Sequence, residues 1–399
     1  MEIVIVTAVF PPEPVVSAQL SFDIAEKLSV DKNVTVISPI PSRPFGFKFS
    51  KELGHRNFSH HILESYTCPS SNLFGRIIES YSFGRYSYRY ISENQKHIGV
   101  IYINTWPLFS QYFTIKAARK FNIPTIIHIQ DIYPESLGNK IPLLKNLINF
   151  ILLPIDKYVL QNATRIVAIS EKMKHHLSTT RRIAKEKIDV VLNWQDEEKF
   201  ILFNEQNLPA QKDDAPFTFM YLGNVGPVAG IEWLISTYVQ AKILNARLVI
   251  AGSGSMKESL QKSVKENKYD NIEFWPVPEG MVPEIQNHAD VMILPIQKGA
   301  ASSSIPSKLP AYMFSGKPII ACVDVNSDTA NAVISAECGW VTPPEDQNAL
   351  IQKLVMVTSL EKDELQMKGL SGCNYSLDHF SKKKNLKRMI DIINQTATS

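Results

Sequence analysis

The sequence lacks long apolar runs, paired cysteines and a strong charge imbalance. No stretch of about 18 consecutive apolar residues occurs in its 399 residues, so we expect no segment that spans a bilayer. A net charge of +3 is too small to indicate nucleic acid as a partner. The four cysteines form no C-x-x-C pair, which favours a reducing compartment and no zinc site. The opening MEIVIVTAVFPPEP has no basic segment before its apolar run, which predicts a first strand and not a signal peptide.

Short apolar segments alternate with helical ones through the first half of the chain. Each apolar segment has the length of a buried strand, and helices are predicted over 16–28 and 73–95. Residues 40–72 are predicted to be irregular. This alternation predicts a doubly wound parallel sheet of the α/β class. The predicted strands are 3–7, 34–37, 100–103, 125–129, 166–169 and 190–192.

The same alternation begins again at residue 217 and predicts a second domain. The preceding segment, 196–216, is charged and polar and ends at Pro216, so we predict an interdomain linker there. The two domains would be 1–195 and 217–378, followed by a basic helix within 379–399, and each is long enough for its own core. The predicted strands of the second domain are 217–222, 247–251, 272–274, 291–294 and 319–322.

A basic and aromatic segment lies between Pro41 and Lys96. It has eight basic and four acidic residues, and aromatic residues are interleaved with them. No nucleic-acid-binding motif accompanies the segment, so we do not expect nucleic acid as a partner. An anionic membrane surface or a lipid-pyrophosphate acceptor would suit it. The alternative is a helix that packs its aromatic side chains inward and leaves its arginines in solvent.

The segment 141–155 is amphipathic. Seven apolar side chains would share one helical face opposite Lys145, Asn146 and Asn149, and Leu143, Phe150 and Leu153 widen the apolar surface. Most helices of this kind cover a sheet. The width of the apolar surface also fits contact with a membrane, so both interpretations are open.

Polar residues directly follow the strand predicted at 125–129, in the segment 130–135, QDIYPE. Ligands of open α/β sheets bind beyond the carboxyl ends of the strands, so Asp131 and Glu135 are candidates for substrate contact. An Asp and a Glu at this spacing also occur in an ordinary turn followed by a helix cap.

Glycines follow the strand predicted at 217–222. Gly223 and Gly226, with Asn224 between them, precede a helix predicted from Ile231, so backbone N–H groups there could approach a phosphate closely. Glycines also serve tight turns, so this loop alone is weak support for a ligand.

A serine-rich loop and a lysine precede the strand predicted at 319–322. A short helix is predicted from Pro306 and Ser307, and Lys308 adds a positive charge in its first turn. Unpaired N–H groups and the helix dipole attract anions at such a position. Lys298 lies earlier in the same loop, and a capped helix with solvated lysines is the alternative. The serines of this loop are Ser302, Ser303 and Ser304.

Two motifs in this region carry a resemblance to a known family. The segments 304–320, SIPSKLPAYMFSGKPII, and 338–346, CGWVTPPED, resemble the nucleotide-sugar half of the family 4 retaining glycosyltransferases. They are most similar to the bacterial O-antigen and capsule subgroup, which includes N-acetyl-L-fucosamine transferases. Further matches extend the resemblance over nearly the whole chain. It implies the GT-B fold, in which two doubly wound, Rossmann-like domains face a cleft and the last helix crosses back to the first domain.

The resemblance also implies roles for the candidate residues. The reaction would break the bond between a sugar and a nucleoside diphosphate, so the largest task is to stabilise the leaving diphosphate. Lys308 would do this with Lys298, the serines and the glycine loop, and the backbone near Val277 would contact the nucleobase. Asp131 and Glu135 would act beside the acceptor. The acceptor side would further include Glu13, His128 and Tyr133.

On the donor side, four positions differ from the family pattern. Asn224 and Ala229 align with an arginine and a lysine that bind the diphosphate in many members. Ser303 and Ala311 align with two glutamates of the family. Lys308 would therefore carry more of the electrostatic task. The sequence has no obvious D-x-D element for a metal, so we expect neither a metal nor another cofactor to be required.

The resemblance implies an enzyme that moves a sugar from a UDP donor to a lipid-linked oligosaccharide in O-antigen or capsule biosynthesis. The expected sugar is a 6-deoxy-hexosamine such as N-acetyl-fucosamine. The expected partners are the nucleotide sugar, the lipid-pyrophosphate-linked acceptor and the inner face of the cytoplasmic membrane, where the protein would be peripheral. The alternatives are a UDP-sugar 2-epimerase of the same fold and a non-catalytic subunit that binds sugar nucleotides.

Overall fold

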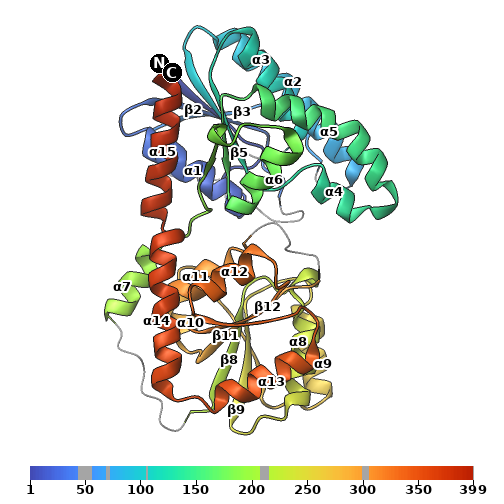
Figure 1. Ribbon diagram of the computed structural model, residues 1–399, viewed down its shortest axis with the longest axis vertical. Helices are drawn as coiled ribbons and strands as arrows, with labels where there is room; N and C mark the ends of the chain where they lie inside the picture. Colours follow the sequence, from blue (N-terminus) through green and yellow to red (C-terminus); the bar gives the residue numbers. More distant parts are fainter. Residues whose placement is uncertain (44–55, 69–71, 105–106, 207–214, 299–304, 399) are drawn as a thin grey trace. The chain divides into compact units, whose positions relative to one another are not determined.

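The computed structural model describes residues 1–43, 56–68, 72–104, 107–206, 215–298 and 305–398. The chain forms two units, each built around one parallel β-sheet (Figure 1). The N-terminal unit consists of Met1–Asn193 and Lys384–Ser399, and the C-terminal unit consists of Trp194–Lys383. Within the described residues, no helix is long and apolar enough to cross a membrane.

The N-terminal unit contains a seven-stranded sheet whose neighbouring strands are all parallel. The order β3-β2-β1-β4-β5-β6-β7 reverses direction between β1 and β4. Both of these strands are buried along nearly their whole length, because helices cover the two faces of a parallel sheet. The strands are β1 (Glu2–Val6), β2 (Asn33–Ser38), β3 (Ser59–Ile62), β4 (Ile98–Asn104), β5 (Thr125–Ile129), β6 (Arg165–Ala168) and β7 (Ile188–Val190).

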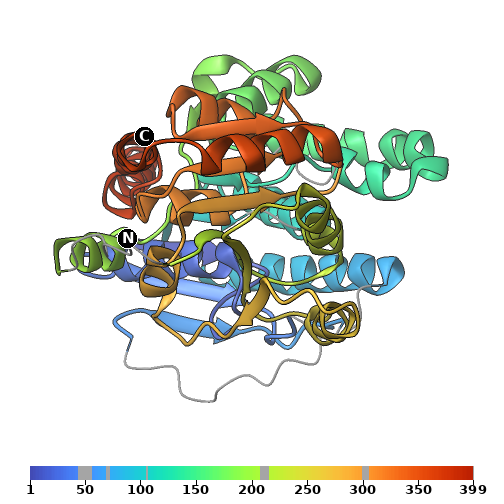
Figure 2. The same ribbon diagram turned by 90° about the horizontal axis from the view of Figure 1, so that it is seen from below.

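Two helices of the N-terminal unit begin at capping side chains. Asn72 Oδ1 accepts a hydrogen bond from the Gly75 amide at 2.6 Å, and Ser170 Oγ accepts one from the Met173 amide at 3.1 Å. Figure 2 shows the light-blue helix α2 and the teal-green segment of α4 and α5 reaching outward beyond the strands. The helical elements are α1 (Val16–Leu28), α2 (Leu73–Asn94), α3 (Leu108–Lys120), α4 (Glu135–Lys140), η1 (Pro142–Leu144), α5 (Lys145–Asn162), α6 (Glu171–Arg181), η2 (Lys185–Lys187) and α15 (Lys382–Thr398).

The C-terminal unit contains a six-stranded parallel sheet in the order β10-β9-β8-β11-β12-β13. The order reverses between β8 and β11, which is where parallel sheets of this kind open toward a ligand. The strands are β8 (Phe217–Leu222), β9 (Ala246–Ala251), β10 (Ile272–Trp275), β11 (Val291–Pro295), β12 (Ile319–Cys322) and β13 (Gly339–Thr342). The helical elements are α7 (Glu198–Gln206), η3 (Pro227–Ala229), α8 (Ile231–Ala241), α9 (Lys257–Glu266), α10 (Val282–Asn287), α11 (Lys308–Phe314), α12 (Asp328–Ser335), α13 (Gln347–Thr358) and α14 (Lys362–His379).

The structure confirms the doubly wound α/β class, and the apolar runs at 125–129, 217–222 and 319–322 coincide with β5, β8 and β12. Two strands are not apparent from the sequence. β3, SHHI, lies inside the segment predicted to be irregular, and it is a largely exposed edge strand without an apolar run. β13, GWVT, begins with a glycine, which weakens its strand pattern.

Two segments contain different helices from those expected. The linker predicted at 196–216 includes α7, whose buried Phe200 stacks on Phe314 with ring centroids 5.9 Å apart. The basic helix expected within 379–399 is present as α15, which begins at Lys382. The amphipathic segment 141–155 is divided between η1 and α5, which meet after Leu144.

Candidate functional site

Loops that follow β8, β9 and β10 meet at the carboxyl edge of the C-terminal sheet, where ligands of parallel sheets bind. Backbone hydrogen bonds join them in order. The Gly223 amide donates to the Ala251 carbonyl at 3.0 Å, and the Gly252 amide donates to the Trp275 carbonyl at 3.1 Å. The glycine loop predicted from the sequence is therefore part of a continuous layer of backbone.

Gly252 and Gly254 allow these loops to approach so closely. Their φ angles are +135° and +154°, which disfavour other residues. A Cβ atom at 252 would overlap the Gly223 carbonyl oxygen, and one at 254 would overlap the Val225 carbonyl oxygen. Any larger residue would push the two loops apart. We call residues 223–226 and 252–254 the glycine shelf.

Lys308 lies directly against the glycine shelf. A Cβ atom at Gly223 would overlap the Lys308 Cε atom, so the lysine side chain occupies the space that this glycine leaves open. Lys308 Nζ lies 5.5 Å from the centroid of the Tyr221 ring, in a cation–π arrangement. Among the described residues, no carboxylate forms an ion pair with it, and burial lowers its pKa. A half-buried ammonium group without an acidic partner is suited to bind an anion.

Two buried tyrosines hold Lys308 and the shelf in place. Tyr312 follows Lys308 by one helical turn in α11, and its hydroxyl donates to the Leu222 carbonyl at 2.7 Å and accepts from the Leu222 amide at 3.0 Å. The Tyr221 hydroxyl donates to the Asn224 carbonyl at 2.7 Å. The start of α11 is thereby attached to the end of β8. Neither tyrosine was predicted as a site residue, although Tyr312 belongs to the motif that carries the family resemblance.

The short helix that carries Lys308 begins slightly later than predicted from Pro306 and Ser307. α11 has seven residues and begins at Lys308, and Ser307 makes no side-chain capping bond. A helix this short contributes a weak dipole, so the lysine charge itself dominates this position. The three serines Ser302, Ser303 and Ser304 lie outside the described residues.

The remaining donor-side candidates lie around this edge of the sheet. Asn224 is exposed within the glycine shelf, and Gly226 is buried beside it. Val277 is half-buried two residues after the end of β10. Lys298 is exposed, and its backbone N–H lies 3.5 Å from a carboxylate oxygen of Glu345. The structure thus places the lysine of α11, and not Lys298, against the shelf.

In the N-terminal unit, the loop that follows β5 begins at Gln130. The Gln130 side chain donates to Asn104 Oδ1 at 2.7 Å and accepts from Ser17 Oγ at 2.8 Å. Asp131 Oδ1 accepts the Ile132 amide at 2.8 Å. This loop is therefore fixed to the end of β4 and to α1 at its first residue. We call residues 131–135 the acceptor loop, after the role that the sequence predicts for it.

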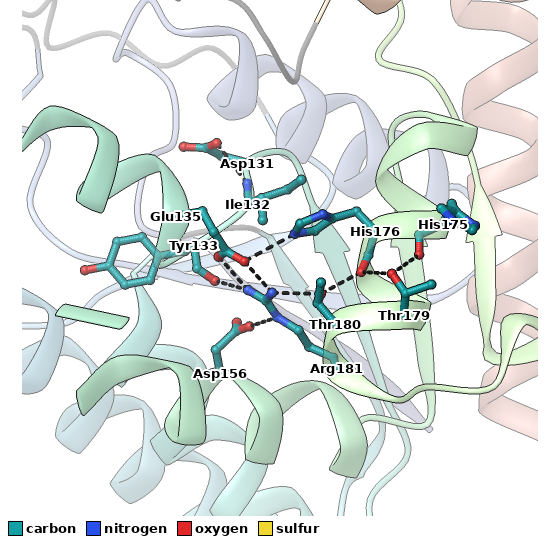
Figure 3. A network of polar contacts seen from close by, with 10 residues as sticks. All are labelled: Asp131, Ile132, Tyr133, Glu135, Asp156, His175, His176, Thr179, Thr180 and Arg181. Carbon is teal, nitrogen blue, oxygen red and sulfur yellow. Dashed lines mark hydrogen bonds and ion pairs between the residues drawn. The ribbon is translucent and has the colours of Figure 1, made fainter. Parts of the chain in front are cut away.

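Glu135, at the other end of the acceptor loop, is bound by Arg181 at the end of α6 (Figure 3). The two guanidinium Nη atoms contact its two carboxylate oxygens at 2.5 and 2.6 Å, and Nε contacts Asp156 in α5 at 2.7 Å. One Nη also donates to the Tyr133 carbonyl at 2.9 Å. His176 lies 3.2 Å from Glu135. Figure 3 shows Asp131 directed away from this cluster.

The electrostatics of the cluster follow from burial and from Arg181. Burial would raise the pKa of Glu135, but the hydrogen bonds and charge of Arg181 outweigh it and lower that pKa to about 2. Burial raises the pKa of Asp156 to about 6, although Arg181 opposes this. Burial would lower the pKa of Arg181, but its two carboxylate partners raise it. Glu135 and Arg181 therefore form a stable ion pair.

This arrangement revises the catalytic role predicted for Glu135. Both of its oxygens are engaged by Arg181, so the carboxylate supports the loop and is not available as a base. Tyr133 contributes its carbonyl to the same support, and burial raises the pKa of its hydroxyl. Asp131 is the carboxylate of the acceptor loop that this ion pair does not hold. It lines a small cavity together with Gln111, Asp156 and apolar side chains.

Two acceptor-side predictions are corrected by burial and hydrogen bonding. His128 is 0% exposed inside β5, its Nδ1 lies 2.7 Å from the Tyr102 hydroxyl, and burial lowers its pKa to about 3. Glu13 is also buried, and its carboxylate accepts the amides of Ser42 and Arg43 at 2.9 and 2.8 Å. His128 is thus a neutral core residue, and Glu13 holds the backbone after β2 to the loop after β1.

Five apolar residues of η1 and α5 form an exposed surface that we call the apolar tip. Their exposed fractions run from 48% to 99%, which is far above what a helix that only covers a sheet requires. Within the same helix Leu152, Val159 and Leu160 are buried in the core. The segment therefore covers the sheet with one part and exposes apolar side chains with another. The apolar tip consists of Leu143, Leu144, Leu147, Phe150 and Ile151.

The basic and aromatic segment is similarly divided. Arg43 and Arg76 both pair with Glu79 at 2.9 and 2.7 Å, and Arg56 lies over the Phe10 ring at 5.2 Å from its centroid. These arginines serve the interior of the unit. Other residues of α2 remain exposed and apolar, namely Phe74, Ile77, Ile78, Tyr81 and Tyr86. Lys48 and Lys51 lie outside the described residues.

Models of two glycosyltransferase families match the chain. The model described as Glycosyltransferase Family 4 matches residues 22–199, which include the acceptor loop and Arg181. The model described as Glycosyl transferases group 1 matches residues 216–359, which include the glycine shelf and Lys308. Both candidate regions therefore lie within the matched residues.

Curated relatives match part of the chain. The glycosyltransferase WbjE of Pseudomonas aeruginosa is 24% identical over 262 residues, which make up 60% of this chain and 61% of that protein. WcaI of Escherichia coli K12, assigned as a colanic acid biosynthesis glycosyl transferase, is 24% identical over 233 residues, or 53% of this chain and 51% of the relative. The match thus spans between about half and three fifths of these relatives.

A solved structure has the same fold over the whole chain. HepE of Anabaena, crystallised with UDP and glucose, aligns with a TM-score of 0.69 and 13% identity over 99% of both chains. At this identity the likeness establishes the fold, which is the two-sheet GT-B architecture.

Proposed function

The chain belongs to the family 4 glycosyltransferases, and from this premise we propose that it transfers a sugar from a UDP donor to a lipid-linked oligosaccharide, with retention at the anomeric carbon. The sugar is a 6-deoxy-hexosamine such as N-acetyl-fucosamine, and the product enters O-antigen or capsule biosynthesis. The UDP bound to HepE and the assignment of WcaI to colanic acid biosynthesis support the donor and the pathway class. The observation that carries the proposal is Lys308, a half-buried cation against the glycine shelf.

Lys308 acts on the leaving diphosphate. During transfer, the bond between the anomeric carbon and the diphosphate oxygen breaks, and UDP leaves with its electron pair. The acceptor hydroxyl oxygen bonds to the same face of the sugar and gives up its proton, which the departing diphosphate oxygen takes up. Negative charge grows on the leaving oxygen as the bond breaks, so a fixed ammonium group lowers the barrier more than it strengthens substrate binding.

On the acceptor side, Asp131 contacts the acceptor, and Glu135 keeps Asp131 in place. Asp131 follows β5 at the carboxyl edge of the sheet and is half-buried. Glu135 lies four residues after Asp131 in the chain, and Arg181 fixes its carboxylate. Asp131 and Glu135, which have the same predicted role in the sequence analysis, therefore have different roles.

We further propose that the reaction needs no metal ion, because Lys308 can balance part of the charge on the diphosphate. Activity should then survive treatment with EDTA. A complete loss of activity that Mg²⁺ or Mn²⁺ restores would contradict this point.

We also propose that the protein binds peripherally to the inner face of the cytoplasmic membrane through the apolar tip and the exposed residues of α2. The helices α2 and α5 both contact α3, Tyr81 of α2 through Phe113 and Tyr158 of α5 through Tyr112. Apolar side chains with basic neighbours bind anionic lipid surfaces. Sedimentation with phosphatidylglycerol vesicles should remove wild-type protein from solution, and Phe150→Ser should reduce this binding.

Release of UDP tests the transferase activity most simply. With UDP-N-acetyl-fucosamine and a bacterial lipid extract that contains lipid-linked saccharides, UDP release should depend on the extract. A 2-epimerase would convert the sugar nucleotide without any acceptor. A non-catalytic subunit would bind UDP and release none from the donor, and either result would overturn the proposal.

A further inference from the structure

Arg181 connects the two ends of the segment 135–156 in the N-terminal unit. Its guanidinium contacts Glu135, the first residue of α4, and Asp156, which lies in α5. Between these two acids the chain passes through α4, η1 and the first turns of α5, and the apolar tip lies on this segment. One buried side chain therefore holds together the two ends of the segment that carries the tip (Figure 3).

The contacts of Arg181 are complete. Nε donates to Asp156, one Nη donates to Glu135 and to Thr180 Oγ1, and the other donates to Glu135 and to the Tyr133 carbonyl. An arginine has five N–H donors, so all of them are used. The side chain is 0% exposed, which makes each contact costly to lose. A lysine has three donors from a single nitrogen and cannot reproduce this set.

The same arginine reaches the acceptor loop. It holds the loop backbone at Tyr133 and its last side chain at Glu135, and Asp131 lies two residues before Tyr133. Asp131 and Asp156 also line one cavity. The candidate acceptor residue and the end of the segment that carries the apolar tip therefore border the same space. A displacement of α4 or α5 would therefore move the surroundings of Asp131.

We propose that Arg181 is a positioning residue that couples the apolar tip to the acceptor loop. When the tip enters a lipid surface, the segment that carries it becomes fixed, and Arg181 transmits this order to residues 131–135. The loop would then be most ordered where a lipid-linked acceptor is present. This inference rests on the membrane binding given above as part of the proposed function, and it adds a regulatory link between that surface and the acceptor site.

Hydrogen exchange with and without vesicles tests the coupling and needs neither donor nor acceptor. In wild-type protein, vesicles of phosphatidylglycerol and phosphatidylcholine should slow amide exchange in the tip and, by about tenfold, in residues 132–136. In Arg181→Lys the tip should still be protected, but the loop should exchange at the same rate with and without vesicles. Arg165→Lys is the matched control. Arg165 pairs with Asp189 at 2.7 Å in the same unit but away from the tip, so this variant should behave as wild type.

The outcomes separate the coupling from the membrane binding. If vesicles protect the tip but not the loop of the wild-type protein, or protect the loop equally in Arg181→Lys, the coupling is wrong and the membrane binding stands. If vesicles protect neither segment, both are wrong. Should Arg181→Lys fail to fold, Glu135→Gln takes its place, because it removes one charged contact and leaves the Asp156 contact of Arg181 intact. The same loss of loop protection is expected for it, and retained protection would overturn the coupling.

Discussion

Arg181 is buried and Lys308 is half-buried, and among the described residues only Arg181 has acidic partners that compensate its charge. Arg181 in the N-terminal unit binds two carboxylates and uses all its donors. Lys308 in the C-terminal unit faces the Tyr221 ring and, within the described residues, pairs with no acid. A shielded charge is costly unless a partner compensates it. We infer from this difference that Arg181, whose charge is compensated, stabilises the structure. Lys308, whose charge is not, is available to bind an anionic ligand.

The largest expected effect on folding comes from removing the compensated cation. Arg181→Ala leaves Asp156 and Glu135 without their partner, and the loss of one member of a buried ion pair typically costs about 3–5 kcal/mol of stability. Urea denaturation should show this loss as a lower free energy of unfolding at pH 7. Lys308→Ala should unfold near the wild-type midpoint, because no ion pair among the described residues is broken. A comparable loss in both variants would remove the distinction between the two cations.

The largest expected effect on turnover comes from the other cation. Loss of one preorganised group that stabilises developing charge typically lowers kcat by about 10²–10³-fold, or roughly 3–4 kcal/mol. Lys308→Ala should show a decrease of this size in steady-state release of UDP. Lys298→Ala, which changes an exposed lysine of the same unit, should have a much smaller effect. If Lys308→Ala kept more than about a tenth of wild-type kcat, the diphosphate would be held by other groups.

A smaller decrease in kcat is expected when the Lys308 side chain is displaced but its charge remains. The methyl group of Gly223→Ala would overlap the Lys308 side chain and displace it from the shelf, so we expect kcat to fall by about tenfold. Gly226→Ala is the matched control, because the atoms nearest to its added methyl group belong to the Asn224 side chain at 3.6 Å or more. Steady-state kinetics of the two variants decide the point, and equal losses would show that the effect does not arise from displacement of Lys308.

The smallest expected effect concerns pH and the partner of Arg181. The pKa of Asp156 is raised to about 6 by burial, whereas an aspartate in an unfolded chain titrates at about 4. Between these values the folded protein binds a proton that the unfolded chain has lost, so this group makes stability fall as pH rises from about 4 to about 6. Asp156→Asn should remove this contribution, which thermal denaturation at both pH values can measure. An unchanged difference in melting temperature would assign the pH dependence to other groups.

Much of the fold could be predicted because apolar runs mark buried parallel strands directly. On the donor side, Gly223 follows a strand end and Lys308 begins a helix, and the structure places these two residues against each other. The Arg181 cluster carries no such signal. Arg181 lies 46 positions from Glu135 and 25 from Asp156, and each of the three looks like a surface residue when taken alone. His128 likewise looks available in the sequence, and only the packed sheet shows that it is enclosed.

The central claim is that Lys308 recognises the diphosphate, and the binding of UDP and of uridine tests it most directly. Isothermal titration calorimetry can compare the two ligands, because uridine shares the base and ribose of UDP but has no phosphate. A charge-assisted contact contributes about 1.5–3 kcal/mol, so Lys308→Ala should weaken UDP binding by roughly 10–100-fold. Binding of uridine should stay the same. If the substitution weakened both ligands equally, or neither, Lys308 would not be the group that holds the diphosphate.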